Sequence, residues 1–159
     1  MNRNTKAHTS KRDGGFTLIE VMVVVLIIGV LLAIGVPTYL GARERAQDRS
    51  AQSSVRTAQS AALVIYTDEA DFRDVTVREL RTVEPGFTWL SANSASNDDN
   101  RISVATRSNG TEWGAAAMSD SGTCFYIRLR ESGTTLYGSS SSASCTGNQA
   151  LSRARSTGW

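Results

Sequence analysis

The stretch GGFTLIEVMVVVLIIGV, residues 14–30, is an apolar run that carries one carboxylate, Glu20, near its beginning. No side chain from Val21 to Val36 is polar, and none from Val21 to Ala42 is charged. As a helix, this span is long enough to cross the roughly 30 Å hydrocarbon core of a bilayer. The stretch therefore predicts a membrane helix, and it raises the question of why a charge enters that environment.

The charges on either side of the apolar run predict its orientation. Four basic residues precede it, opposed only by Asp13, and none follows it immediately; they are Arg3, Lys6, Lys11 and Arg12. This asymmetry predicts a cytoplasmic N-terminus and an exported C-terminal part. The formal net charge of the 159 residues is +2, but from Phe16 onward thirteen arginines oppose fourteen acidic residues. A chain that began at Phe16 would have no basic excess to hold a phosphate backbone, and no nucleic-acid partner is expected.

Three simpler interpretations of the apolar run compete with a specialised role. A secretory signal peptide would be cut at small residues, whereas Leu40-Gly41-Ala42 places a bulky residue where a small one is needed. The buried helix of a soluble core would not need Val, Ile and Leu around its whole circumference. A permanent single-pass anchor fits the length. None of the three explains Glu20.

A carboxylate inside hydrocarbon needs a partner, because its insertion costs about 2.5 to 3.5 kcal/mol. Cleavage between Gly15 and Phe16 would create an α-ammonium four residues before Glu20, the separation at which groups on a helix become neighbours. The ammonium of an adjacent copy would serve equally well. Since an unpaired buried charge is penalised, pairing between copies would drive each incoming copy into the register that satisfies the charge.

The basic leader, Gly15 and the following FTLIEVMVVVLIIGVLLAIGVPTY resemble the N-terminus of type IV pilins and of the related pseudopilins of type II secretion. The likeness covers residues 14 to about 66, and Asp13 with Gly14 departs mildly from a wholly basic leader. The resemblance implies that a prepilin peptidase cleaves between Gly15 and Phe16 and N-methylates Phe16. It also implies that Glu20 neutralises the Phe16 amine of a neighbouring subunit during assembly.

The resemblance further implies a structural subunit of a type IV pilus, a helical filament of many copies together with minor pilins, which serves adhesion, motility or DNA uptake. The implied partners are the prepilin peptidase, an inner-membrane assembly platform and, before assembly, the membrane itself. The chain would be a single-pass membrane protein first and part of an extracellular pilus afterwards. The alternative is a type II secretion pseudopilin in a periplasmic piston filament, and a competence pilin that handles DNA comes third.

The helix is expected to continue beyond the membrane. Pro37 removes a backbone donor and, with Gly35, is expected to kink or loosen the helix, and the resemblance implies that this region melts in the filament. An amphipathic helix is then predicted to about Tyr66, with an apolar stripe of Leu40, Ala51, Val55, Ala58, Ala62 and Ile65. The expected organisation is a leader (1–15), a transmembrane and assembly helix (16–42), an amphipathic helix (43–70) and a globular head (71–159).

The head is predicted to be rich in β-structure. A short helix is expected at Val77–Val83, followed by strands at Phe87–Leu90, Ile102–Arg107, Trp113–Ser119, Thr123–Arg130 and Thr135–Gly138. The later four strands are expected to form an antiparallel meander. Asn109-Gly110 predicts a two-residue hairpin turn, which explains the sequon that ends at Thr111 without a glycan. With the amphipathic helix covering one sheet face, the fold class is α+β, and the resemblance implies a ladle shape.

Cys124 and Cys145 lack CxxC spacing and have no nearby histidine, so a disulfide is favoured over a zinc site and over two free buried thiols. It would close a loop of about 20 residues, worth roughly 3 kcal/mol, in an oxidising compartment. The segment 124–145 also resembles the disulfide-bounded loop of many pilins, which favours a pilin over a pseudopilin. Asp98 and Asp99 could offer calcium ligands, as in some major pseudopilins, but their surroundings are ordinary turn composition and no metal is expected.

The amino-acid composition argues against a catalytic function. After Gly15 the chain contains neither Lys nor His, so it lacks the commonest general base and the commonest amine nucleophile. Neither an enzymatic activity nor a cofactor is expected, and a carboxylate-only hydrolase would require paired acids in a cleft. A covalent sortase-type pilus is disfavoured, because no LPxTG-like signal is present and no lysine would remain after cleavage.

Overall fold

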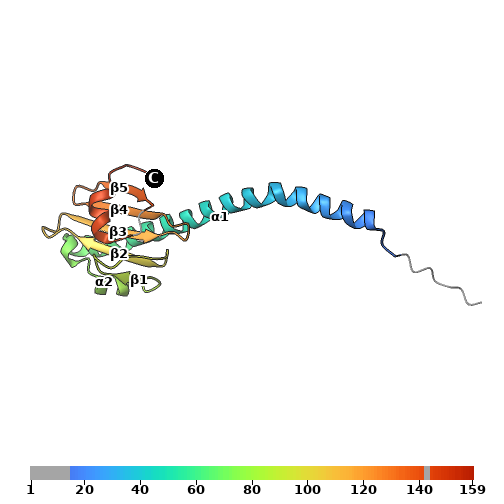
Figure 1. The fold of residues 1–159 in the computed structure, drawn as a ribbon. Helices are drawn as coiled ribbons and strands as arrows, with labels where there is room; N and C mark the ends of the chain where they lie inside the picture. Colours follow the sequence, from blue (N-terminus) through green and yellow to red (C-terminus); the bar gives the residue numbers. More distant parts are fainter. Residues whose placement is uncertain (1–14, 142–143) are drawn as a thin grey trace, which may run out of the picture. The chain divides into compact units, whose positions relative to one another are not determined.

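The computed structural model describes residues 15–141 and 144–159. The chain divides into two compact units, Met1–Leu40 and Gly41–Trp159. Most of the leader expected at 1–15 lies outside the described residues. In chain order the elements are α1 (Leu18–Glu69), a 3-10 turn (Phe72–Asp74), α2 (Val77–Val83), β1 (Thr88–Leu90), β2 (Arg101–Thr106), β3 (Glu112–Met118), β4 (Cys124–Arg130), β5 (Thr135–Ser140) and α3 (Gly147–Arg153) (Figure 1).

Helix α1 belongs to both units, and its first part forms the described portion of the N-terminal unit. An 18-residue window of this helix has a mean hydropathy of 3.0, and none of the window is buried within the chain. The helix is long and apolar enough to cross a membrane. It runs through Pro37 without a break in the helical assignment. This N-terminal apolar helix fits a membrane-anchored protein.

The second part of α1 packs on the sheet through an apolar stripe in the Gly41–Trp159 unit. Five of the six stripe residues expected from the sequence are buried there, namely Ala51, Val55, Ala58, Ala62 and Ile65. The sixth expectation was wrong, because Leu40 is 48% exposed. It lies at the end of the N-terminal unit, before the helix reaches the sheet. Three of the five buried residues are alanines, so this stripe is built mainly of small side chains.

The sheet has five strands in the order β1-β2-β3-β4-β5. Strands β2 to β5 form the expected antiparallel meander, whereas β1 pairs with β2 in parallel, with Trp89 opposite Ile102. One face carries the main core and packs against α1. Its largest fully buried side chains include Trp89, Trp113 and Ile127. The α+β fold class expected from the sequence is confirmed.

The opposite face of the sheet is covered by α3, a helix that the sequence analysis did not predict. Thr146 caps it reciprocally with Gln149, a capping box that favours a helix start at this position. Three glycines bring α3 and the sheet into direct contact. A Cβ at Gly114, Gly138 or Gly147 would lie 3.1, 2.6 or 2.4 Å from the nearest atom across the interface. Alternation along the strands thus gives each face its own helical cover.

The hairpin between β2 and β3 differs from the expectation in its loop length. The pair Arg107 and Glu112 closes a loop of residues 108–111, with the Arg107 N–H donating to the Glu112 carbonyl at 2.9 Å. A two-residue type I′ turn would need positive φ at both central positions. Gly110 has φ of 75°, but Asn109 is not among the described residues with positive φ. Instead its side chain accepts from Thr111, which closes the turn locally.

Candidate assembly site and polar network

The carboxylate of Glu20 is bonded to the first turn of its own helix. The Thr17 backbone N–H and hydroxyl donate to Glu20 Oε2 at 2.8 and 2.7 Å, and the Glu20 N–H donates to Thr17 Oγ1 at 3.3 Å. This reciprocal arrangement is a capping box, in which each side chain satisfies a backbone donor left free at the helix start. A negative charge in the first turn is also favoured by the helix dipole. The sequence analysis missed this partner, although Thr-x-x-Glu before an apolar run signals it.

The structure contains Gly15 joined to Phe16, so the Phe16 nitrogen is a peptide nitrogen here. Cleavage between the two residues would convert it into an ammonium group, one residue before the capping threonine. Glu20 would then have two possible kinds of partner, the donors of Thr17 and an ammonium group of its own or of another copy. The processing at Gly15 and Phe16, and the role of both Phe16 and Glu20 in assembly, stay predictions.

The first part of α1 presents apolar side chains on all sides. Leu18, Leu26 and Ile34 are 83%, 67% and 69% exposed within the chain. A Cβ added at Gly29 or Gly35 would meet no atom within 4 Å. Since hydrocarbon-like surface of this extent is unfavourable in water, the segment requires a lipid environment or the helices of other copies.

The Gly35–Pro37 segment is fully helical in the structure, but it lacks one of the backbone hydrogen bonds of a regular helix. Pro37 has no N–H to donate to the carbonyl four residues earlier. The next residue, Thr38, donates its hydroxyl to the Ile34 carbonyl at 3.1 Å, as threonines in membrane helices commonly do. The expected kink or melting at Gly35 and Pro37 stays a prediction for the assembled state.

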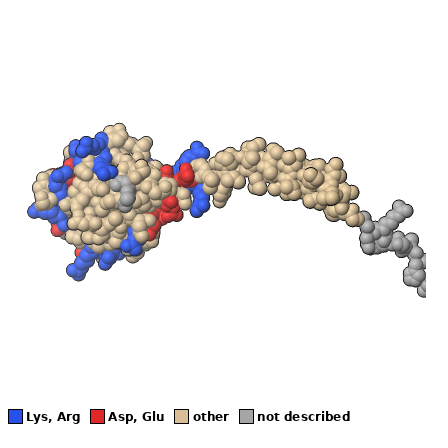
Figure 2. Space-filling view, in the orientation of Figure 1, with Lys and Arg blue, Asp and Glu red and all other residues tan. Residues whose placement is uncertain are grey.

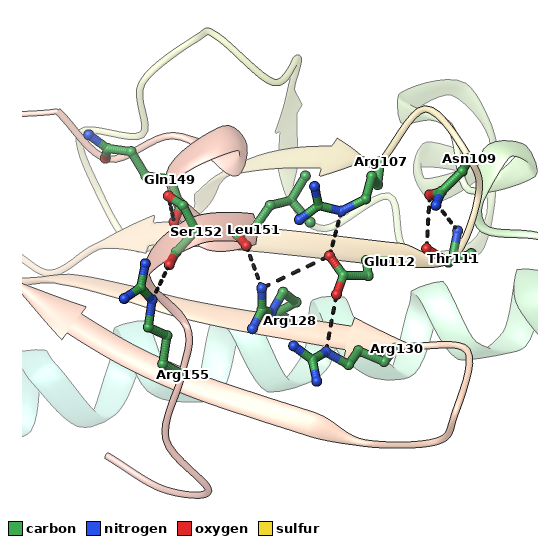
Figure 3. A network of polar contacts seen from close by, with 10 residues as sticks. All are labelled: Arg107, Asn109, Thr111, Glu112, Arg128, Arg130, Gln149, Leu151, Ser152 and Arg155. Carbon is green, nitrogen blue, oxygen red and sulfur yellow. Dashed lines mark hydrogen bonds and ion pairs between the residues drawn. The ribbon is translucent and has the colours of Figure 1, made fainter.

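In the globular unit, the most connected charged group is Glu112 at the start of β3. Its carboxylate accepts from Arg107 Nε at 2.6 Å and from Arg130 Nε at 3.1 Å, and Arg128 Nη1 lies 3.9 Å away (Figure 3). Arg128 Nη1 also donates to the Leu151 carbonyl at 2.6 Å. The network therefore joins two hairpins of the sheet to the last turn of α3.

Burial and the neighbouring charges shift the pKa values of Glu112 and Arg128 in this network. Burial would raise the pKa of Glu112, but the hydrogen bond from Arg107 and the positive charges of Arg107, Arg128 and Arg130 outweigh it, so the pKa lies below its ordinary value. Burial lowers the pKa of Arg128, and the charge of Glu112 opposes that effect. Both groups are ionised near neutral pH, since arginine stays protonated in proteins.

Asp98 and Asp99, the weak calcium candidates, are engaged with protein groups. Asp98 Oδ1 accepts from the Asn100 N–H at 2.9 Å, and Asp99 Oδ2 accepts from the Ser50 hydroxyl. Within the described ranges, no group of three or more His, Cys, Asp or Glu side chains is arranged to hold a metal ion. These contacts are those of an Asx-type turn that is fastened to α1.

The predicted disulfide between Cys124 and Cys145 is present, with a Cα–Cα distance of 5.5 Å. It joins the start of β4 to the segment that leads into α3. The C-terminal residue is docked as well, because Trp159 Nε1 donates to the Gly138 carbonyl at 3.0 Å and its ring contacts Phe125 and Tyr137. The guanidinium of Arg56 lies 4.8 Å from the ring centroid of Trp159. Both features hold the end of the chain against the sheet.

Comparison with known proteins gives a family match near the N-terminus and relatives that align with only part of the chain. Residues 10–36 match the family described as the prokaryotic N-terminal methylation motif. Type II secretion system core protein G of Pectobacterium carotovorum subsp. carotovorum is 39% identical over 59 residues, which are 37% of this chain and 38% of that protein. Type IV major pilin protein PilA of Myxococcus xanthus is 33% identical over 63 residues, 40% of this chain and 29% of that protein. A fimbrial protein of Pseudomonas aeruginosa is 48% identical over 52 residues, 33% and 34% of the two chains.

These matches confirm the resemblance to type IV pilins and type II secretion pseudopilins at the N-terminus. Residues 10–36 include Gly15, Phe16 and Glu20. The aligned parts cover 38%, 29% and 34% of the three relatives' lengths, so most of each relative is outside the alignments. No solved structure matches the chain significantly.

Proposed function

We propose that this protein is the structural subunit of a type IV pilus, made as a membrane-anchored precursor and assembled through its N-terminal helix. The observation that carries the proposal is the combination of a prepilin-type motif over residues 10–36 with an apolar helix that is exposed along its whole first part. Cleavage after Gly15 would free the Phe16 amine for the carboxylate of Glu20. The apolar helices would then leave the membrane by packing against one another.

Two features support assembly of parallel copies. Glu20 lies at one end of the apolar segment, so an ammonium group of another copy can reach it only if both helices point the same way and are nearly in register. Apart from Glu20, no side chain from Phe16 to Ala42 is charged, so the carboxylate is the dominant polar determinant of that register. The remaining contacts between helices are apolar and little directed.

The proposed topology follows from the leader. Its basic residues would stay in the cytoplasm while the Gly41–Trp159 unit is exported. The Cys124–Cys145 disulfide supports this orientation, because disulfides persist in oxidising compartments. After assembly the globular units would form the extracellular surface of the filament. The role is structural and non-enzymatic, and the proposed partners are other copies, minor pilins, a prepilin peptidase and an inner-membrane assembly platform.

A second candidate is a type II secretion pseudopilin that forms a short periplasmic filament. Its support is the similarity to the type II secretion core protein G of several organisms, which covers 31% to 37% of this chain. The disulfide between the sheet and the C-terminal segment favours the pilin. Accumulation of the protein in long surface filaments under ordinary expression would support the pilin, whereas confinement to the periplasm would support the pseudopilin.

Mass spectrometry of filaments sheared from cells tests the proposal directly. We expect an abundant mature chain that begins at N-methylated Phe16. The matched variant Gly15→Ala should accumulate in the membrane as an uncut precursor and should be missing from the sheared fraction. Filaments built from chains that still begin at Met1 would contradict the proposed processing and the pairing of Glu20 with a free amine.

A further inference from the structure

Three arginines of the globular unit form a cluster with an excess of positive charge. Arg107, Arg128 and Arg130 surround the single carboxylate of Glu112 (Figure 3). We call these three arginines the arginine cluster. The exposed Glu131 follows Arg130 in sequence, and the two carboxylates together leave one of the three positive charges uncompensated.

The centre of the arginine cluster is the buried member, Arg128. Its side chain is 10% exposed, and its Nε is buried without a hydrogen-bond partner among the described residues. A buried cation is costly unless it is fully paired, and here the nearest carboxylate oxygen, Glu112 Oε2, is 3.9 Å away and already accepts from Arg107, while Arg130 bonds to Oε1. Arg107 and Arg130 are 47% and 43% exposed, so they can reach an additional anionic group outside the chain.

The opposite end of the same strands carries a complementary group of acids. Asp48 accepts from the Ser121 hydroxyl at 2.5 Å, Asp99 accepts from Ser50, and Asp98 and the exposed Asp120 lie in the same two loops. We call Asp48, Asp98, Asp99 and Asp120 the aspartate cluster. None of the four forms an ion pair with another described residue. Figure 2 shows acidic side chains gathered where α1 enters this unit, with arginines of α1 beside them.

The two clusters are separated along β3 and β4. The arginine cluster lies at the Glu112 and Arg130 ends of these strands, and the aspartate cluster adjoins the Met118 and Cys124 ends, where the turn carries Asp120. Seven residues of strand span about 20 Å, which is too far for the clusters to pair within one chain. The arginine cluster and the aspartate cluster therefore lie at opposite ends of these two strands.

We propose that the arginine cluster of one copy binds the aspartate cluster of a second copy. This inference rests on the proposed function, because parallel packing of the N-terminal helices orients all globular units the same way. Copies that stack in one orientation along these strands present the arginine cluster of one to the aspartate cluster of the next. The contact is heterologous, since it joins two different surfaces of the same chain, and heterologous contacts that do not close build open helical polymers. Complementary charge would also suppress the opposite, head-to-head orientation.

A charge exchange in the full-length protein, expressed in its own organism, tests this contact. Arg130→Glu and Asp120→Arg, made separately, should each lower the fraction of the protein in sheared filaments about tenfold, the effect expected for one charge pair of an interface. The two changes combined in one chain restore opposite charges across the contact. The doubly substituted protein should recover to within about twofold of the unaltered protein.

The exposed Arg78, on α2 and outside both clusters, supplies a matched control, and Arg78→Glu should leave the filament fraction unchanged. Thermal unfolding of each detergent-solubilised variant, followed by fluorescence of the buried Trp89 and Trp113, separates loss of contact from loss of fold. Normal filament fractions in both single variants, or a double variant no better than the poorer single one, would overturn this inference alone. An absence of filaments from the unaltered protein would overturn the proposed function and this inference with it.

Discussion

At the scale of single residues, Glu20 has a capping role in the structure and a second, pairing role in the proposed assembly. Its carboxylate completes a capping box with Thr17, which satisfies the free donors at the start of α1. Its charge is the property required for pairing with an amine of another copy. The capping role is available to the uncut chain, whereas the proposed pairing role would require cleavage after Gly15.

Substitutions at Glu20 and Thr17 distinguish these purposes. Glu20→Gln keeps a side chain that can complete a capping box but removes the charge, and Thr17→Ala removes the capping hydroxyl but keeps the charge. We expect Glu20→Gln and Glu20→Ala to insert into the membrane normally and to lose filaments at least tenfold. Thr17→Ala should cost about 1 kcal/mol of helix stability and retain most filaments. Electron microscopy of sheared fractions measures the outcome, and normal piliation of Glu20→Gln would show that the charge is dispensable.

Glu112 is the second residue whose charge has structural consequences. Because its pKa in the folded state lies below the ordinary value of 4.5, the unfolded chain binds a proton more readily than the folded chain does. The stabilisation is therefore complete above pH 4.5 and is lost as the pH falls through the folded-state pKa. Acid should loosen the junction between the two hairpins and α3 before it affects the apolar core.

Replacing Glu112 with Gln should destabilise the globular unit by about 2 to 3 kcal/mol, since Arg128 would keep a buried charge without a nearby carboxylate. Urea unfolding followed by tryptophan fluorescence at pH 7 and pH 3.5 measures this loss. The difference between variant and unaltered protein should shrink at the lower pH. Glu131→Gln is the matched control, because Glu131 is exposed, and it should change the free energy of unfolding by less than about 0.5 kcal/mol.

At the scale of elements, α3 is held by close contact rather than by length. It has seven residues, too few to be stable alone, and it lies on the sheet through Gly114, Gly138 and Gly147. The disulfide at Cys145 and the capping box at Thr146 fix its first turn, and Arg128 bonds to its last turn through the Leu151 carbonyl. The helix is thus specified by the surface on which it packs.

The close packing of α3 on the sheet can be tested by adding one methyl group at the interface. A Cβ at residue 147 would lie 2.4 Å from the Val104 carbonyl carbon, and the obstructing atoms are backbone atoms of β2 that cannot turn away. We expect Gly147→Ala to cost about 1 to 3 kcal/mol in the free energy of unfolding. Gly158→Ala is the control, because a Cβ there meets nothing within 4 Å. Equal melting temperatures for the two variants would contradict the close packing.

At the scale of the whole molecule, the two units have opposite solvent requirements. The N-terminal unit exposes apolar side chains throughout its described part, whereas the Gly41–Trp159 unit encloses its own core and carries charges on its surface. The core of the second unit is built entirely from its own residues, from Ala51 to Leu129. Independent stability is the physical expectation for a unit of this kind.

A chain of residues 43–159 should therefore be soluble and folded without detergent. We expect cooperative thermal unfolding and the fluorescence emission of buried tryptophans from Trp89 and Trp113. Mass spectrometry should detect an intact Cys124–Cys145 disulfide under oxidising conditions. The full-length chain supplies the comparison, since it should require detergent while showing the same fluorescence transition. A non-cooperative transition in the shorter chain would mean that the first 42 residues contribute to the fold of the second unit.

By itself, the sequence determined the features that depend on neighbouring residues. The membrane helix follows from an uninterrupted apolar run, the buried stripe of α1 from a helical period, and the meander from alternating short strands. The motif of Gly15, Phe16 and Glu20 was also readable, because it is contiguous and occurs at the edge of that apolar run. Leu40 failed as a stripe residue because periodicity does not say where a helix leaves its sheet.

Only the tertiary structure decided what lies on the far face of the sheet. The pattern Thr146-x-x-Gln149 indicates the start of a helix. A helix of seven residues, however, becomes stable only through its contacts with Gly114 and Gly138, which are distant in sequence. Likewise, Arg107, Arg128 and Arg130 come together around Glu112 through the register of three strands. Strand register and the choice of covered face depend on the total packing of the core, which no local pattern contains.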